Sequence, residues 1–67
     1  MEKFDIFISY DGMYSLEETE KLFEILKERD NWEHDFFEIN EDFGNYLVEI
    51  ISHKEYFVHI MVSRIED

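Results

Sequence analysis

Residues 46–63, YLVEIISHKEYFVHIMVS, decide the fold of this chain, because they contain its two strongest strand patterns. The segments 46–52 and 55–63 are rich in β-branched and aromatic residues, with apolar side chains recurring at alternate positions. His53 and Lys54 lie between them, a spacing that predicts a hairpin with a two-residue turn. Because these two residues do not favour the usual turn types, a longer loop remains an alternative.

Two further strand patterns lie nearer the N-terminus. Residues 3–10, KFDIFISY, alternate between two faces, and Asp11-Gly12 is a turn signal that ends the pattern. Residues 34–39, HDFFEI, predict a second strand, and residues 40–45, NEDFGN, predict a loop that leads to the C-terminal hairpin. Gly44 is the residue of this loop that is expected to adopt a positive φ.

A helix is predicted between these strands, over residues 15–30. Ser15 is a favourable N-cap residue, and Glu18 three positions later completes a capping-box pattern. Acidic residues in the first turns and basic residues in the last turn suit the helix dipole. The residues that recur at helical spacing along its apolar side are Leu16, Thr19, Leu22, Phe23 and Leu26.

This order of elements predicts an α+β fold, β-α-β-β-β, with residues 1–67 forming a single domain. The simplest architecture is a single four-stranded mixed sheet with one helix packed on one face. If the first two strands lie parallel in this sheet, the helix is a right-handed crossover between them. The strand residues expected to pack against Leu16, Leu22, Phe23 and Leu26 of the helix are Phe4, Ile6, Ile8, Phe37, Ile39, Val48, Ile50, Tyr56, Val58, Ile60 and Val62.

One helix covers only one face of a sheet, so the alternate strand residues are expected on an uncovered face. These residues are largely apolar, although water alone would favour polar side chains there. They are Phe7, Phe36, Leu47, Ile51, Phe57, His59 and Met61. Three explanations remain open: burial within the chain, a foreign partner, and a homodimer assembled through Phe7, Phe57, His59 and Met61.

The charge of the chain is strongly unbalanced, because 18 Asp and Glu face only six Lys and Arg, a formal net charge of −12. This charge opposes a compact state and exceeds the roughly 2 to 8 units that keep a small domain soluble. It argues against direct binding to nucleic acid or to anionic membranes. It favours a partner protein with a basic surface, and a nucleic-acid-binding protein is one such partner.

Most of the negative charge falls between residues 17 and 42. The residues predicted to contact the basic partner are Glu17, Glu20, Glu24, Glu28, Asp30, Trp32, Glu33, Asp35, Phe36 and Glu38. The carboxylates are expected to steer and orient the partner, and the two aromatic residues to anchor it. A merely solvated helix face is the alternative. In size and charge the chain is similar to small acidic inhibitors among phage anti-restriction proteins, anti-CRISPR proteins and nuclease inhibitors, which implies inhibition by nucleic-acid mimicry.

No catalytic or metal site is predicted. His34, His53 and His59 stand in no paired-ligand spacing, and the chain has no cysteine. No serine lies in a nucleophile-elbow context. We therefore expect no enzyme activity, no metal and no cofactor. The lack of cysteine and of any apolar run of membrane-spanning length favours a cytoplasmic protein that does not enter membranes.

Overall fold

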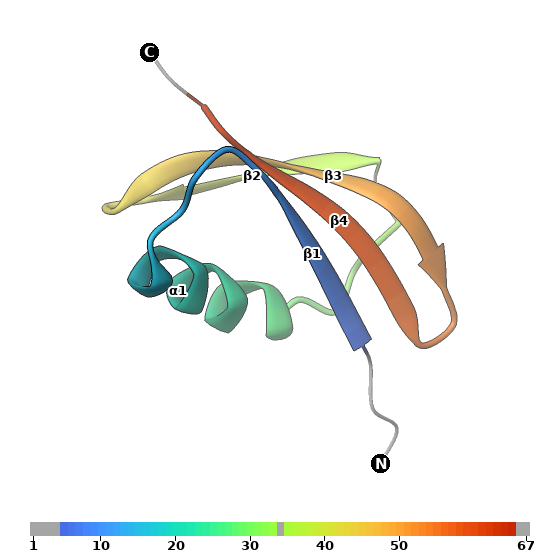
Figure 1. Ribbon diagram of the computed structural model, residues 1–67. Helices are drawn as coiled ribbons and strands as arrows, with labels where there is room; N and C mark the ends of the chain where they lie inside the picture. The colour runs from blue at the N-terminus through green and yellow to red at the C-terminus, as the bar shows by residue number, and fades with distance from the viewer. Residues whose placement is uncertain (1–4, 34, 66–67) are drawn as a thin grey trace.

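The computed structural model describes residues 5–33 and 35–65 of the chain. Its elements follow in the order β1 (Asp5–Asp11), α1 (Leu16–Lys27), β2 (Phe36–Glu41), β3 (Gly44–Lys54) and β4 (Phe57–Arg64). The four strands form one mixed sheet, and the helix lies against one of its faces (Figure 1). The predicted α+β fold and its element order are therefore confirmed.

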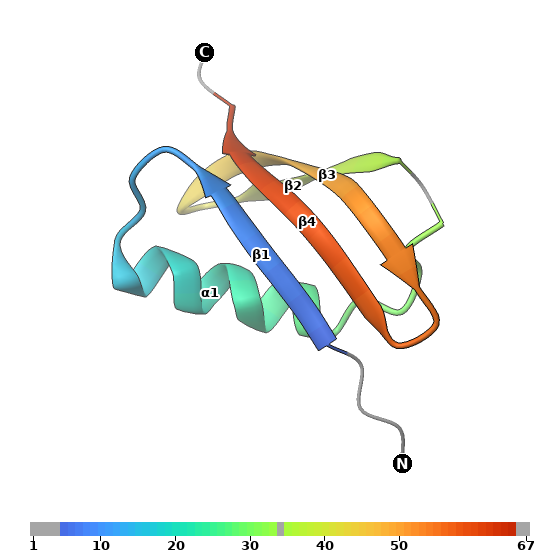
Figure 2. The ribbon, with the colours of Figure 1, turned by 45° about the vertical axis from the view of Figure 1, so that its right-hand side comes forward.

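The strand order in the sheet is β1-β4-β3-β2, with β1 parallel to β4 and the other neighbouring pairs antiparallel. β1 and β2 therefore run in the same direction, as a crossover helix requires, but they occupy opposite edges. The connection through α1 passes across one face of the sheet (Figure 2). The helix thus spans the two intervening strands instead of joining neighbours, and it leaves β1 as an edge strand.

The helix begins where the sequence predicts and ends earlier. Ser15 Oγ accepts a hydrogen bond from the Glu18 amide at 3.1 Å, and Glu18 Oε1 accepts one from the Ser15 amide at 3.4 Å. Both bonds of the predicted capping box are therefore present. The helix ends at Lys27, since the amides of Glu28 and Arg29 bond to carbonyls three residues back, a tighter turn that closes the helix.

The turn between β2 and β3 is shorter than the predicted loop over 40–45. Glu41 pairs with Gly44, so only Asp42 and Phe43 remain in the turn. Gly44 has the expected positive φ, at 155°. A Cβ atom at this position would lie 2.7 Å from the hydroxyl oxygen of Tyr46, so the absence of a side chain at Gly44 makes room for that ring.

The hairpin between β3 and β4 is longer than predicted. Lys54 pairs with Phe57, so the two-residue turn is Glu55–Tyr56 and not His53–Lys54. The register shifts between Ile50 and Ser52, which leaves Ile51 as an extra residue in β3. The extra residue brings Val48 opposite Val62 and Ile50 opposite Ile60, so that the residues of β3 and β4 that pack in the core share one face of the sheet.

The core lies between α1 and the sheet. Its buried residues are Leu22, Leu26, Trp32, Ile39, Tyr46, Val48, Val58, Ile60 and Val62. Ile6, Ile8, Phe37 and Ile50 are half-buried against them. Most of the predicted inner face of the sheet is therefore confirmed.

Three residues that were expected in the core are exposed. Leu22 and Leu26 point at the sheet, so Phe23, about 100° further round the helix, lies at the flank and is 46% exposed. Leu16 in the first turn is 75% exposed, and Tyr56 in the β3–β4 turn is 44% exposed. Trp32 and Tyr46, which were not expected in the core, are buried there. Phe4 and His34 lie outside the described residues.

Candidate functional site

The outer side of α1 carries a row of exposed carboxylates, those of Glu17, Glu20, Glu24 and Glu28. Lys21 Nζ lies 3.0 Å from Glu17 Oε1, and Lys27 Nζ lies 2.9 Å from Glu24 Oε2. These ion pairs are exposed to solvent and contribute little to stability. Within residues 5–33 and 35–65, no Lys or Arg pairs with Glu20 or Glu28. The outer side of α1 therefore keeps a net negative charge.

The connection between α1 and β2 extends this acidic surface and removes one predicted anchor from it. Asp30, Glu33 and Asp35 are exposed. Trp32 is only 5% exposed, and its ring lies 5.9 Å from that of Phe37 within the core. A ring buried in this way stabilises the fold, so the side chain of Trp32 is not exposed for contact with a partner.

The last two residues of the predicted contact set lie on a different face. Phe37 and Ile39 pack toward the helix, so the alternate residues Phe36 and Glu38 point to the opposite face of the sheet. Phe36 is 63% exposed there. The predicted contact set is therefore divided between two faces. Its carboxylates on α1 lie together on one surface, whereas Phe36 and Glu38 lie apart from them.

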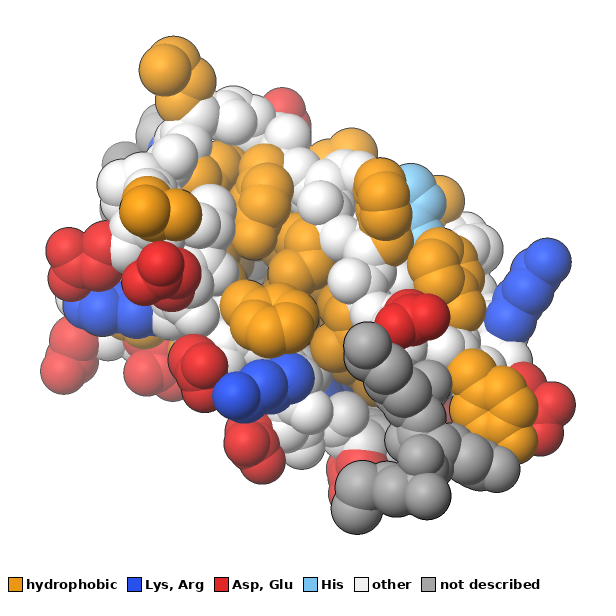
Figure 3. Space-filling view, turned by 60° about the horizontal axis from the view of Figure 1, so that its bottom comes forward, with side chains coloured by type: hydrophobic (Ala, Val, Ile, Leu, Met, Phe, Trp, Pro, Cys, Tyr) orange, Lys and Arg blue, Asp and Glu red, His pale blue; other side chains and the backbone are white. Residues whose placement is uncertain are grey.

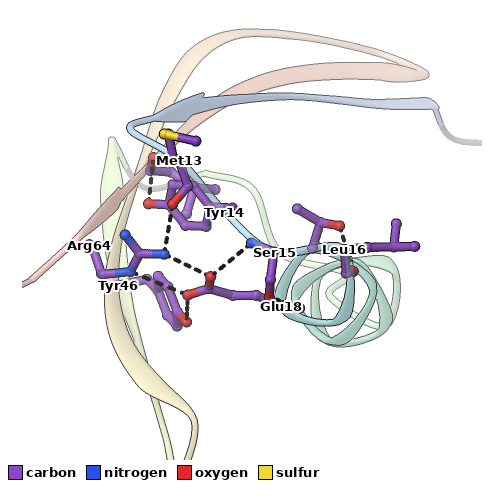
Figure 4. A network of polar contacts seen from close by, with 9 residues as sticks. Met13, Tyr14, Ser15, Leu16, Glu18, Tyr46 and Arg64 are labelled. Carbon is purple, nitrogen blue, oxygen red and sulfur yellow. Dashed lines mark hydrogen bonds and ion pairs between the residues drawn. The ribbon is translucent and has the colours of Figure 1, made fainter.

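Glu18 has the same charge as its neighbours on α1 but a different environment (Figure 4). Its side chain is 15% exposed and receives two hydrogen bonds from Arg64, at 2.7 Å from Nη2 and 3.3 Å from Nε. The hydroxyl of Tyr46 donates a third at 2.5 Å. Arg64 also donates to the carbonyl of Met13 at 3.0 Å and lies 4.3 Å from the ring centre of Tyr14. This network ties the start of α1 to β3 and β4.

The protonation states in this network follow from its hydrogen bonds. The bonds from Arg64 and then Tyr46 lower the pKa of Glu18, because they stabilise the carboxylate. Burial, and then the bond to Glu18, raises the pKa of Tyr46 to about 12. Glu18 is thus ionised and Tyr46 protonated at neutral pH, as their donor and acceptor roles require.

A groove runs between α1 and β1. One part, of about 700 Å³, is lined by Ile8 and Tyr10 of β1 and by Thr19, Glu20 and Phe23 of α1, among others. A second part, of about 490 Å³, shares Phe23 and reaches Asp5, Ile6 and Trp32. Figure 3 shows hydrophobic side chains gathered in the hollow of this face, beside a flank of acidic and basic ones. The groove therefore combines side chains of the edge strand with side chains from the flank of α1.

The sheet face away from α1 brings together the residues that were predicted for an oligomer interface. In the β1–β4 register Phe7 lies opposite His59, and Met61 and Phe57 lie on either side of His59 along β4. The rings of Phe7 and His59 meet edge to face at 4.8 Å, and His59 Nε2 lies 2.9 Å from Ser9 Oγ in a hydrogen bond. Phe7 is 56% exposed and Phe57 is 36% exposed. No helix or strand of the described part of the chain covers this face.

Other kinds of site find no support in the described residues. No group of three or more His, Asp or Glu side chains among them converges in a way that could hold a metal ion. No helix in the same part of the chain is long and apolar enough to cross a membrane. Comparison with protein-family models, with curated proteins and with solved structures yields no match.

Two features of the site escaped sequence reasoning. The groove depends on the pairing of β1 with β4, a contact between residues more than 50 positions apart. The network around Glu18 depends on the register that places Tyr46 opposite Arg64. The capping-box spacing indicated the local role of Glu18, but no local pattern pointed to its distant partners.

Proposed function

We propose that this chain is a small acidic protein that binds a basic surface of another protein, as an inhibitor or adaptor. The observation that carries the proposal is the net charge of −12 on 67 residues, more than solubility needs. The exposed carboxylates on the outer side of α1 support it, since a surface of one sign attracts and orients a partner of the opposite sign.

A nucleic-acid-binding protein is the partner class that this surface suits best. Glu20, Glu24 and Glu28 follow one another at intervals of about 6 Å along the helix. Lys and Arg side chains that bind the phosphates of a nucleic acid can bind such carboxylates instead. The chain would then act as a mimic of nucleic acid, in the manner of the anti-restriction, anti-CRISPR and nuclease-inhibitor classes that it resembles in size and charge.

The proposal is tested by removing the carboxylates on the outer side of α1. In the variant with Glu20, Glu24 and Glu28 changed to Gln, we expect a fluorescent Arg-rich peptide to associate more slowly and with a weaker dependence on salt. Stopped-flow measurements over a series of NaCl concentrations give both quantities. Unchanged association at low salt would contradict the proposed steering.

A matched control separates the position of the charges from their number. Glu41, Glu49 and Glu55 are exposed carboxylates outside α1, and changing all three to Gln alters the net charge by the same amount. We expect this control variant to slow association less than the α1 variant does. Equal effects would mean that only the total charge matters and that α1 is not the contact surface.

A second candidate function is a homo-oligomeric structural or regulatory module. The observation that favours it is the contiguous set of Phe7, Phe57, His59 and Met61 on the sheet face away from α1, in which the two phenylalanines are exposed and His59 and Met61 are half-buried. If this face joins copies of the chain, changing Phe57 and Met61 to Ser leaves a folded monomer, as sedimentation would measure. A wild-type chain that is already monomeric at micromolar concentration excludes this candidate.

A further inference from the structure

The outward edge of β1 offers backbone groups to another strand. β1 pairs with β4 along one side only, and no strand of the described chain pairs with its other side. The amide of Asp5 bonds to the carbonyl of Tyr56 at 2.9 Å, on the β4 side. Backbone groups of successive strand residues point to opposite sides, so those of Ile6, Ile8 and Tyr10 point to the open edge.

Within the described residues, β1 also lacks several of the devices that commonly protect an edge strand. It is seven residues long, contains no Pro or Lys, and pairs with β4 without a register shift. Its only charged residues, Asp5 and Asp11, stand at its two ends. The opposite edge strand, β2, differs in carrying Glu38 within the strand and being six residues long. The two edges of the sheet are therefore unequal, and β1 is the one suited to pair.

The groove beside the open edge of β1 provides side chains that a strand paired with this edge could contact. Ile6, Ile8 and Tyr10 point into it from the strand, and Phe23 stands between its two parts. Its charged lining residues are five acids and three bases, namely Asp5, Glu17, Glu20, Glu24 and Asp30 against Lys21, Lys27 and Arg29. Two of these bases already pair with Glu17 and Glu24, and the guanidinium of Arg29 lies 3.6 Å from the ring centre of Phe37. The groove is thus apolar at its centre and acidic in balance.

We propose that the open edge of β1 binds an extended basic segment of the partner protein as a fifth strand of the sheet. Alternate apolar side chains of that segment lie in the groove against Ile8 and Phe23, and Lys or Arg at its two ends lie beside Asp5 and Asp11. This inference rests on the proposed function, because it takes the partner to be basic, and it specifies how that partner is held.

The charges at the ends of β1 argue for a basic segment and against a second copy of this chain. An antiparallel pair of β1 strands centred on Ile8 sets Asp5 of each copy opposite Asp11 of the other. A parallel pair in register sets each aspartate opposite itself. Like charges directly opposite one another destabilise a strand pair, whereas Lys or Arg at the same positions stabilises it.

The geometry predicts the sequence pattern of the bound segment. Asp5, Phe7, Ser9 and Asp11 alternate with the groove-facing residues Ile6, Ile8 and Tyr10. A seven-residue segment that pairs along β1 therefore has basic residues at positions 1 and 7 and apolar residues at positions 2, 4 and 6. A peptide with Lys at both ends, Val at the three apolar positions and Thr at positions 3 and 5 is a suitable probe.

Amide hydrogen exchange of the full chain with this peptide tests the inference directly. We expect the amides of Ile6, Ile8 and Tyr10 to exchange about tenfold more slowly when the peptide is bound. The amides of Phe7 and Ser9 point toward β4 and serve as internal controls, which should not change. Peptides methylated on the backbone nitrogens of either the even or the odd positions should differ, one set losing affinity and the other keeping it.

Two side-chain variants complete the test. Phe23→Ser is expected to weaken binding of the Val-containing peptide about tenfold, because Phe23 lines the groove and is not part of the buried core. Phe36→Ser removes an exposed aromatic ring at the other edge of the sheet and should leave binding unchanged. A peptide with Glu in place of both Lys residues should not bind.

The outcomes distinguish this inference from the proposed function. If the peptide binds and perturbs the outer side of α1 while the amides of Ile6, Ile8 and Tyr10 exchange as before, strand addition is excluded and the acidic binding surface stands. If neither this peptide nor an Arg-rich one binds at low salt, both fail. Protection of the same three amides that grows with protein concentration alone would show that a second copy occupies the edge, and would overturn the assignment.

Discussion

The inner and outer sides of α1 carry the same residue types in opposite roles. Glu18 on the inner side is 15% exposed in its side chain and is held by Arg64 and Tyr46, whereas the side chain of Glu24 on the outer side is 66% exposed and pairs with the exposed Lys27. Leu26 is fully buried and Leu16 is 75% exposed. Position relative to the sheet therefore decides which side chains stabilise the fold and which are available to a partner.

The largest difference between the two sides is expected for the leucines. Leu26→Ala removes a fully buried side chain and should lower the free energy of unfolding by about 2–5 kcal/mol, enough to unfold much of a domain of this size. Leu16→Ala is the matched control and should change it by less than about 0.5 kcal/mol. Urea titrations followed by tryptophan fluorescence measure both, because Trp32 is buried in the same core. Equal effects would mean that the helix is not oriented as described.

A methyl group at Gly44 in β3 should disturb the contact between Tyr46 and Glu18 on the inner side of α1. In Gly44→Ala the added Cβ would meet the hydroxyl of Tyr46 and displace it from Glu18, and the positive φ would add strain. We expect a loss of about 1–3 kcal/mol in the free energy of unfolding. If the loss is caused by the collision, the double variant Gly44→Ala with Tyr46→Phe should show coupling between the two sites in a double-mutant cycle.

Replacing a carboxylate should lower the free energy of unfolding on the inner side of α1 and have little effect on the outer side. Glu18→Gln weakens the contact with Arg64 and part of the helix cap, so we expect it to lower the free energy of unfolding by about 1–2 kcal/mol. Glu17→Gln, one residue away and exposed, should have little effect. The same thermal or urea transitions compare the two, and similar losses would show that Glu18 has no special role.

The difference in stability between the wild type and Glu18→Gln should also depend on pH. Because the pKa of Glu18 is lowered in the folded state, its contribution is complete above its ordinary value of 4.5 and is lost as pH falls through the lower, folded-state value. Protonation of the exposed carboxylates relieves self-repulsion over an overlapping range and acts in the opposite direction. The stability of the wild type minus that of Glu18→Gln isolates the first effect. This difference should shrink in acid, and a constant difference would contradict the assignment.

The smallest effect is expected for the outer pairs. Lys27→Gln removes the exposed pair with Glu24, which should leave the unfolding transition unchanged within error, although the contact raises the pKa of Lys27. The same substitution increases the net negative charge and should speed the association of an Arg-rich peptide. A clear loss of stability would show that the outer side of α1 also holds the fold together.

Much of this fold could be predicted from local sequence patterns. Alternation in residues 3–10 and 46–63 predicts strands, and the spacing of Ser15 and Glu18 predicts the start of the helix, because these signals arise between neighbouring residues. The ends of the helix and strands were predicted less accurately than their existence. The ends of α1 and of β3 differ from prediction by two or three residues, since a tighter helical turn and the extra residue at Ile51 are decided by packing.

The candidate site, like the fold, could be predicted only in part from the sequence. Composition determined that this chain is acidic and apolar enough to fold, and the alternating patterns showed that it has more apolar strand residues than one helix covers. Tertiary structure alone decided that Trp32 is buried, that Glu18 is bound to Arg64, and that β1 pairs with β4 and leaves a groove beside an open edge. The physical reason is range: charge and periodicity are properties of short stretches of chain, whereas strand order and side-chain burial depend on contacts between residues far apart in the sequence.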